Sequence, residues 1–140
     1  MAKNSAAQIV ELFWSMSKMF KQQLDRSSPA FYLTIAQLEA LRYVSEAQTL
    51  TMKELADCLG VAPPSATAMV DHLVRLGLIK RHQSPSDRRG VNLKLTNKGR
   101  STYKKAMAER CRWFTNLIKN LSAKERAELV EILKKMSKVG

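Results

Sequence analysis

The chain has few of the residues that would support a cross-linked, metal-bound or membrane-embedded protein. It contains two cysteines, Cys58 and Cys111, and neither has a second ligand at metal-binding spacing, so neither a disulfide framework nor a metal site is expected. No uncharged run approaches the roughly 18 residues of a membrane-spanning helix, and Glu11 interrupts any apolar signal-peptide core. We therefore expect a cytoplasmic protein with no membrane partner and no cofactor.

Glycine, proline and acidic residues are also scarce. Five glycines and four prolines in 140 residues argue against a disordered or linker-rich chain, and the length suits one domain per subunit. Twelve acidic residues face 24 Lys and Arg, which gives a formal net charge of +12. Eleven of these basic residues lie between Lys80 and Arg112. This charge favours a polyanionic partner, with nucleic acid as the first candidate and an anionic membrane as the second.

Groups that could carry out catalysis are missing as well. The chain has two histidines, and no nucleophile stands at a recognisable spacing from a base. It also lacks a glycine-rich phosphate loop and paired carboxylates. We expect a protein that is not an enzyme and has no catalytic residues.

What the sequence does contain is helical periodicity at both ends. Apolar residues at three- and four-residue steps predict a helix over about 5–25, broken at 27–29. They are Ile9, Leu12, Phe13, Met16, Phe20 and Leu24. Thr96 can cap a long helix near the other end, and Ser122 with Glu125 forms a capping box before a last one.

Shorter elements are predicted in the middle of the chain. Thr34 followed by Gln37, and Thr51 followed by Glu54, resemble capping boxes, and two prolines suit the first turn of a further helix. Helices are expected over about 34–47, 51–60 and 63–77. Two strand-like segments, 78–83 and 91–95, flank a polar loop. The predicted order is four helices, a hairpin and two helices: a mainly α fold with a small β-hairpin.

A short helix, a tight turn, a second helix and a hairpin with a basic tip follow one another in a winged helix-turn-helix. The second helix must bury one face and present a thin outer face to the major groove, about 12 Å wide. The predicted DNA-binding residues of this helix are Pro64, Ser65, Thr67, Ala68, His72 and Arg75. The small side chains allow close approach, and free N–H groups at the helix start are expected to meet a phosphate.

The hairpin loop supplies the charge that this helix lacks. Arg88 and Arg89 at its tip can reach a minor groove, and Asp87 can hold a neighbouring Arg extended. The predicted DNA-binding residues of the wing are Ser84, Asp87, Arg88 and Arg89. The alternative to DNA contact by these residues is a charged turn that is only exposed to solvent. The basic stretch over 98–112 can likewise be the solvent-exposed face of a helix.

From Leu55 to Gly99 the chain resembles the multiple antibiotic resistance regulator (MarR) family. Three stretches carry the match: 55–60, 66–73 followed by 77–79, and 87–99. The last has the wing pattern of Asp, any residue, Arg, then Leu-Thr and Lys-Gly. The chain departs from the family at Ala62, where a capping Ser or Thr is usual, and at Ala68 and His72, which often are Arg.

The resemblance implies a winged helix-turn-helix lobe over about 34–96, with dimerisation helices over about 5–26 and 97–138, in a single MarR-type domain over 1–140. It implies a homodimer on double-stranded DNA, with Arg89 in the minor groove. It also implies a small-molecule effector in a cleft, for which the candidate pocket residues are Trp14, Tyr32, Tyr43 and Trp113. These aromatic residues suit the core or the dimer interface equally well.

The leading hypothesis is a ligand-responsive repressor that binds a palindromic operator as a homodimer, with half-sites about 34 Å apart. One alternative is a thiol-based oxidant sensor that uses Cys58 or Cys111. A free Cys usually behaves as a small buried hydrophobic residue, which argues against this alternative. Another is a non-specific nucleic-acid binder or protein-interaction module.

Overall fold

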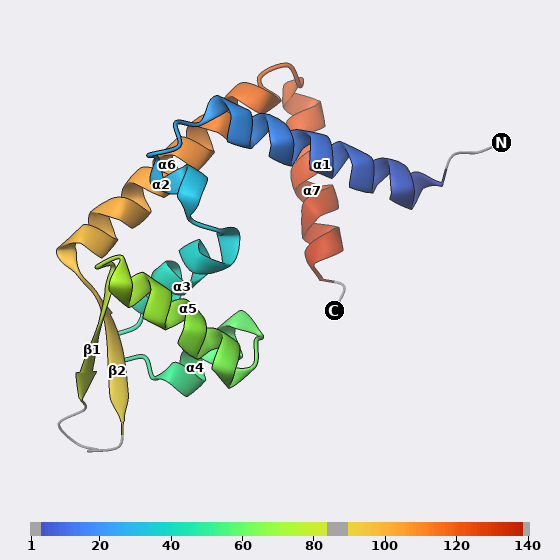
Figure 1. Cartoon of the computed structure of the whole chain (residues 1–140). Helices are drawn as coiled ribbons and strands as arrows, with labels where there is room; N and C mark the ends of the chain where they lie inside the picture. Colours follow the sequence, from blue (N-terminus) through green and yellow to red (C-terminus); the bar gives the residue numbers. More distant parts are fainter. Residues whose placement is uncertain (1–3, 84–89, 139–140) are drawn as a thin grey trace. The chain divides into compact units, whose positions relative to one another are not determined.

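The computed structural model describes residues 4–83 and 90–138 (Figure 1). The chain forms two compact units, Met1–Met107 and Ala108–Gly140. The helices are α1 Ser5–Gln23, α2 Pro29–Tyr32, α3 Ile35–Glu46, α4 Met52–Leu59, α5 Pro63–Arg75, α6 Asn97–Ile118 and α7 Ala123–Ser137, and the strands are β1 Ile79–Gln83 and β2 Val91–Leu95. A mainly α fold with one hairpin is therefore confirmed.

The predicted order of four helices before the hairpin is wrong by one short helix. Helix α1 ends at Gln23, before the predicted break at 27–29, and Ser28 begins α2, because its side chain accepts the N–H of Ala30 at 3.2 Å. Pro29 suits the first position of this helix, where no backbone donor is needed. Five helices thus precede the hairpin in the described stretch 4–83.

The predicted capping boxes explain where α3 and α7 begin. At α3 the Thr34 hydroxyl accepts the N–H of Gln37 at 3.1 Å, and the Gln37 side chain accepts the N–H of Thr34 at 3.0 Å. Ser122 and Glu125 make the same reciprocal pair at α7. Each box satisfies two donors that the first turn of a helix leaves without partners.

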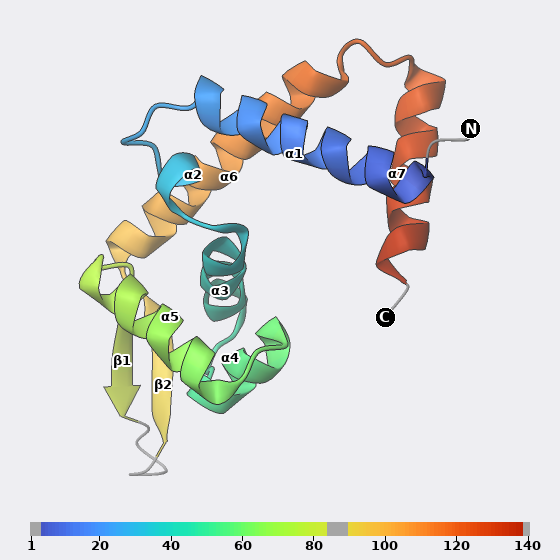
Figure 2. The same cartoon turned by 45° about the vertical axis from the view of Figure 1, so that its right-hand side comes forward.

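The strands pair antiparallel, with Ile79 opposite Leu95 and Gln83 opposite Val91 (Figure 2). A short extended segment continues this small sheet, because the N–H of Leu93 donates to the carbonyl of Leu50 at 2.8 Å and Thr51 bridges Asn92. The segment between α3 and α4 therefore ties the helices to the hairpin.

The core of the first unit lies among α3, α4, α5 and the hairpin. Its largest fully buried side chains are Leu33, Leu41, Leu55, Val70, Leu73, Leu78, Ile79 and Leu93. Burial of side chains of this size contributes about 1.5–3 kcal/mol each, so this cluster is the main stabilising feature of the unit. By contrast, α1 and α7 have no buried residue of their own. None of the described helices is long and apolar enough to cross a bilayer.

Candidate nucleic-acid interface

Helices α4 and α5 are joined by a tight turn that the sequence specifies. Thr51 accepts the N–H of Glu54 at 3.1 Å to start α4, and Gly60 ends it with φ of +66°, a conformation that favours glycine. Leu55 of α4 and Val70 of α5 are both fully buried between the helices. The face of α5 opposite Val70 is therefore left for contacts outside the chain.

The six predicted recognition residues all lie on α5, and none of them is buried. His72 is half-buried, and the other five, Pro64, Ser65, Thr67, Ala68 and Arg75, are exposed. Helical spacing places Ala68, His72 and Arg75 along one stripe, with Thr67 beside it. The structure thus gathers these residues on one narrow surface, and their contact with DNA remains a prediction.

The expectation of free N–H groups at the start of α5 is wrong. Pro63 and Pro64 occupy the first two positions and have no N–H, and the N–H groups of Ser65 and Ala66 donate to the carbonyl of Ala62 at 3.0 and 3.2 Å. Ala62 offers no side-chain cap, as the sequence indicated. Any phosphate contact at this end therefore depends on side chains such as the Ser65 hydroxyl.

The predicted wing residues Ser84, Asp87, Arg88 and Arg89 lie outside the described residues, and their contact with DNA stays a prediction. What the structure describes is the base of the wing. There the guanidinium of Arg81 in β1 forms an ion pair with Asp71 of α5. Asp71 and Arg81 did not figure among the predicted site residues, although their ion pair links the hairpin to the candidate recognition helix.

A second set of contacts holds the end of α5 to the start of α6. The Thr96 hydroxyl donates to the carbonyl of Gly77 at 2.5 Å and accepts the N–H of Gly99 at 2.9 Å. The Lys98 ammonium donates to the carbonyl of Leu76 at 2.9 Å, where a cation also complements the helix C-terminus. The Leu-Thr and Lys-Gly pattern near the wing therefore has a structural task that sequence reasoning did not assign.

The four proposed effector residues lie on four different helices, α1, α2, α3 and α6, and their place in an effector pocket stays a prediction. Trp14 is 70% exposed on α1, and Tyr32 is 43% exposed on α2. Tyr43 packs against the core with the guanidinium carbon of Arg42 4.7 Å from its ring centre. Trp113 belongs to the second unit, where its ring meets that of Phe114 edge-on with centres 4.9 Å apart.

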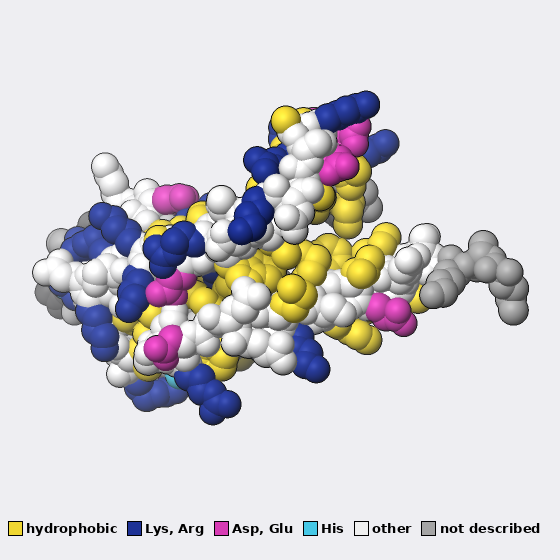
Figure 3. Space-filling view, turned by 90° about the horizontal axis from the view of Figure 1, so that it is seen from above, with side chains coloured by type: hydrophobic (Ala, Val, Ile, Leu, Met, Phe, Trp, Pro, Cys, Tyr) yellow, Lys and Arg dark blue, Asp and Glu magenta, His cyan; other side chains and the backbone are white. Residues whose placement is uncertain are grey.

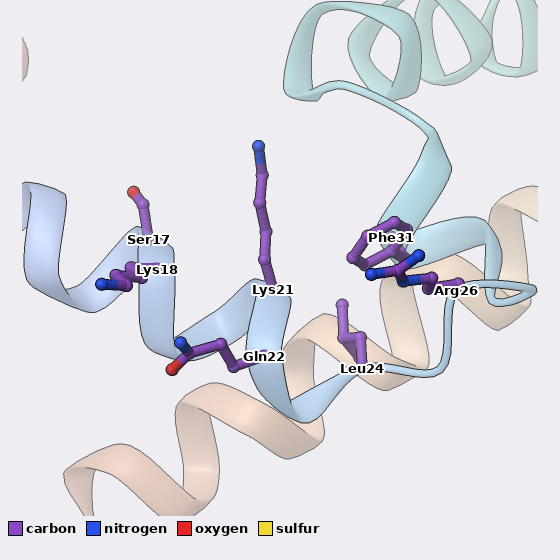
Figure 4. A pocket seen from close by; sticks show the side chains of 7 residues that line it. All are labelled: Ser17, Lys18, Lys21, Gln22, Leu24, Arg26 and Phe31. Atoms are coloured by element: carbon purple, nitrogen blue, oxygen red, sulfur yellow. The ribbon is translucent and has the colours of Figure 1, made fainter.

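A different cavity, of about 630 Å³, lies at the C-terminal end of α1 (Figure 4). Figure 4 shows side chains from α1, from the following loop and from α2 around it. It is lined by Ser17, Lys18, Lys21, Gln22, Leu24, Arg26 and Phe31. The charged side chains of this lining are all cations, and Phe31 adds an aromatic surface. This lining suits an anion with an apolar or aromatic body.

The loop beside this cavity is held by Asp25. Its carboxylate accepts both the N–H and the hydroxyl of Ser27, at 2.9 and 2.8 Å. These two hydrogen bonds, the backbone one first, lower the pKa of Asp25, and Lys105 acts in the same direction. The charged form of Asp25 therefore stabilises the turn that carries Arg26.

The two cysteines are free and exposed. The expectation that Cys58 behaves as a small buried hydrophobe is therefore wrong. Exposure alone does not make a thiol reactive, because reactivity follows the thiolate fraction. Among the described residues no group of three or more His, Cys, Asp or Glu could hold a metal ion.

Comparison with known proteins identifies what this architecture is. The sequence profile of the MarR family matches residues 33–91. The chain is 36% identical over 110 residues to the multiple antibiotic resistance protein MarR of Escherichia coli, covering 74% of this chain and 73% of that protein. It is 28% identical over 126 residues to the transcriptional repressor MprA of the same species, covering 90% of this chain and 68% of the relative.

Solved structures agree with the sequence matches. The reduced form of MarR from E. coli has a TM-score of 0.70 and 31% identity, with 90% of this chain and 93% of that one covered. A mutant of MepR from S. aureus shares the fold, with a TM-score of 0.76 and 23% identity over 96% of this chain and 97% of that one. The relatives are regulators, which confirms that the chain is not an enzyme. The chain belongs to the MarR family of winged helix-turn-helix transcriptional regulators, which bind DNA.

Proposed function

We propose that this chain is a homodimeric, ligand-responsive repressor that binds a palindromic operator. Each subunit would place α5 in the major groove and the wing in the minor groove, within a single domain over 1–140 that has its winged-helix lobe over about 34–96. The observation that carries the proposal is the exposed, small-residue face of α5, fixed to the hairpin by the Asp71–Arg81 pair. The name of the repressor MprA, a relative, supports the sign of regulation.

The contact of α5 with DNA can be tested by one added charge. Glutamate is a good helix former, so Ala68→Glu should leave α5 folded while placing an anion against the phosphates. Ala36→Glu is the matched control, because Ala36 is equally exposed on α3. We expect Ala68→Glu to weaken binding to a duplex recovered from the source genome at least tenfold, measured by fluorescence anisotropy. Equal binding by both variants would argue against α5 as the recognition helix.

The arginines of the wing can be tested through salt dependence. Each lost phosphate contact lowers the slope of log K against log salt by about 0.9. We expect Arg88→Gln with Arg89→Gln to flatten the slope, whereas an unchanged slope would exclude the wing from DNA contact.

Sequence specificity is tested by comparing the affinity for the recovered duplex with that for a scrambled duplex. A ratio of the two affinities near one would favour the alternative of a non-specific binder.

A second copy of the chain is the proposed cover for the apolar surface of the terminal helices, the predicted dimerisation helices over about 5–26 and 97–138. Figure 3 shows hydrophobic side chains, in yellow, open at the surface along α1. On α1 they are Ile9, Val10, Leu12, Phe13, Trp14 and Met19, and on α7 they are Leu129, Val130, Ile132, Leu133 and Met136, all at least 36% exposed. Patches of this kind mark interaction surfaces, and related regulators act as dimers.

The dimer is tested by mass in solution. A dimer has twice the 15.8 kDa of the chain. Leu12→Glu should shift the mass from light scattering toward one chain and weaken DNA binding with it, because it places a charge in the apolar surface. Gln8→Glu adds a charge at an exposed polar position of the same helix and should leave the dimer intact. A wild-type protein that is monomeric at micromolar concentration would refute the proposal.

For the effector we propose the cavity around Lys21, Arg26 and Phe31, because its cations and its aromatic ring line one space. Benzoate is a suitable probe and its neutral amide the control. Benzoate should release DNA from the wild type and not from the Lys21→Gln, Arg26→Gln variant, and the amide should release it from neither. If benzoate released DNA equally from the wild type and from the variant, the effector would bind elsewhere.

The oxidant sensor is tested with peroxide. Release of DNA by peroxide that Cys58→Ser and Cys111→Ser abolish would favour the oxidant sensor instead.

A further inference from the structure

A second cleft lies on the hairpin, between the C-terminal end of α3 and the start of α6. It has a volume of about 310 Å³. Its polar lining consists of Ser45 and Gln48 near the end of α3, Lys80 and Lys94 on the strands, and Arg100 on α6. Three cations and two uncharged hydrogen-bonding side chains therefore converge on one small volume, and no carboxylate lines it.

The pairing of the strands forces two of these cations together. Lys80 and Lys94 are direct cross-strand partners in the antiparallel register. Side chains at such positions lie on one face with Cβ atoms about 4.5–5.5 Å apart, and like charges there destabilise the sheet. Among the ion pairs of the described residues, neither lysine takes part. The hairpin therefore keeps a repulsive pair that an anion would relieve.

Arg100 is the third cation of the lining. Its guanidinium donates to the side-chain oxygen of Asn97 at 2.8 Å, a neutral partner that leaves the positive charge of Arg100 uncompensated. A guanidinium presents five donors in a planar fork that matches phosphate oxygens, while lysine ammonium groups contribute point charges. Gln48 and Ser45 can donate further hydrogen bonds to an oxyanion. This donor set favours a multiply charged phosphate group over a monovalent anion.

The two lysines of the cleft lie on the face of the hairpin that is turned away from α5. Arg81 points toward α5, where it pairs with Asp71, and successive side chains of a strand point to opposite faces. Lys80 therefore lies on the other face, as does Lys94, which is exposed beside buried Leu93. A duplex along α5 would lie on the opposite side, and this step alone rests on the proposed function.

We propose that this cleft is a binding site for the phosphate group of a small soluble molecule, separate from the cavity at α1. The volume suits a pyrophosphate or a phosphate ester, since small-ligand sites begin at about 300 Å³. The same chemistry could be satisfied by a phosphate of a nucleic-acid backbone, and the test separates these two sources.

The test uses inorganic pyrophosphate and the full chain without DNA. Calorimetric titration at constant ionic strength should show one saturable site per chain. Lys80→Gln with Lys94→Gln should weaken this binding at least tenfold, whereas Lys104→Gln with Lys119→Gln, which removes the same charge from exposed positions outside the cleft, should change it less than twofold. No saturable binding by the wild type, or equal weakening in both variants, would overturn the proposal.

Thermal unfolding distinguishes loss of the site from loss of the fold. Pyrophosphate should raise the wild-type Tm above that in sodium chloride of equal ionic strength, because a ligand that binds the native state stabilises it. The glutamine variant of Lys80 and Lys94 should lose this rise, yet in sodium chloride it should melt no lower than the wild type. Lys80→Arg with Lys94→Arg should keep the rise of Tm in pyrophosphate. A rise that persists in the glutamine variant would contradict the proposal.

Whether the cleft binds a phosphate of the DNA backbone instead is tested with a DNA duplex. If the cleft holds a soluble ligand, replacing Lys80 and Lys94 leaves the slope of log K against log salt unchanged. A slope that drops by about 0.9 or more in this variant and not in the control would assign the cleft to the DNA backbone and overturn the proposal. Failure of DNA binding as such leaves the titration with pyrophosphate unaffected, so the proposed function and this proposal can fail separately.

Discussion

Replacing Gly99 by alanine sets two effects of opposite sign against each other. Alanine is favoured over glycine within a helix by up to about 1 kcal/mol, so propensity alone predicts a more stable protein. The structure predicts the opposite, because a Cβ on Gly99 would overlap the carbonyl oxygen of Leu78. That oxygen also accepts the N–H of Thr96 at 3.1 Å, so backbone on both sides would have to shift.

The expected magnitude follows from the kind of atom that the new methyl group meets. Inserting a methyl group into a packed site costs about 1–3 kcal/mol, and a backbone partner places the cost in the upper half of that range. After the propensity gain of up to about 1 kcal/mol, we expect a net loss of about 1–2 kcal/mol in the free energy of unfolding.

Urea denaturation followed by circular dichroism at fixed protein concentration measures this loss. Ser101→Ala is the control, because Ser101 lies exposed in the same helix and its replacement should change stability by less than about 0.5 kcal/mol. A Gly99→Ala variant as stable as the wild type, or more stable, would show that the start of α6 does not need to approach Leu78 so closely.

Three further predictions concern single contacts. Ala62→Ser should stabilise the protein by about 1 kcal/mol, since it adds the missing side-chain cap of α5; urea denaturation that shows no gain would contradict it. A double-mutant cycle with Asp71→Asn and Arg81→Gln should give a coupling of about 0.5 kcal/mol, because both side chains are more than a third exposed, and a value above about 2 kcal/mol would contradict this. The pKa of Asp25 is lowered in the fold, so its contribution to stability is present above the unfolded value of about 3.9 and is lost as the pH falls through the lowered pKa. Thermal melts below about pH 4 should therefore fall more steeply for the wild type than for Asp25→Asn, and parallel curves would refute the role of Asp25.

Local signals were sufficient to predict most elements of this fold. The capping boxes at Thr34 and Ser122 involve residues three apart, and alternation within 91–95 identifies a strand without reference to the rest of the chain. The four residues of α2 escaped prediction because one turn is too short to show a period. Ser28, a residue that commonly breaks a helix, here begins one as well.

The candidate site was predicted less completely, and the reason lies in long-range contacts. The outer face of α5 follows from helical spacing, which local sequence contains. The partners of Thr96 and Lys98 lie 19 and 22 residues earlier, and such pairs leave no periodic signal. The two cavities likewise combine residues from several elements, α1, α2 and their loop in one and α3, β1, β2 and α6 in the other, so their cationic linings appear only once the chain is folded.

The junction at Thr96, Lys98 and Gly99 also couples the start of α6 to the helix that carries the exposed candidate recognition face. Two side-chain hydrogen bonds, from Thr96 to the carbonyl of Gly77 and from Lys98 to the carbonyl of Leu76, link the segment that ends α5 to the beginning of α6. A rotation of the first turns of α6 that keeps these two bonds would carry the end of α5 with it.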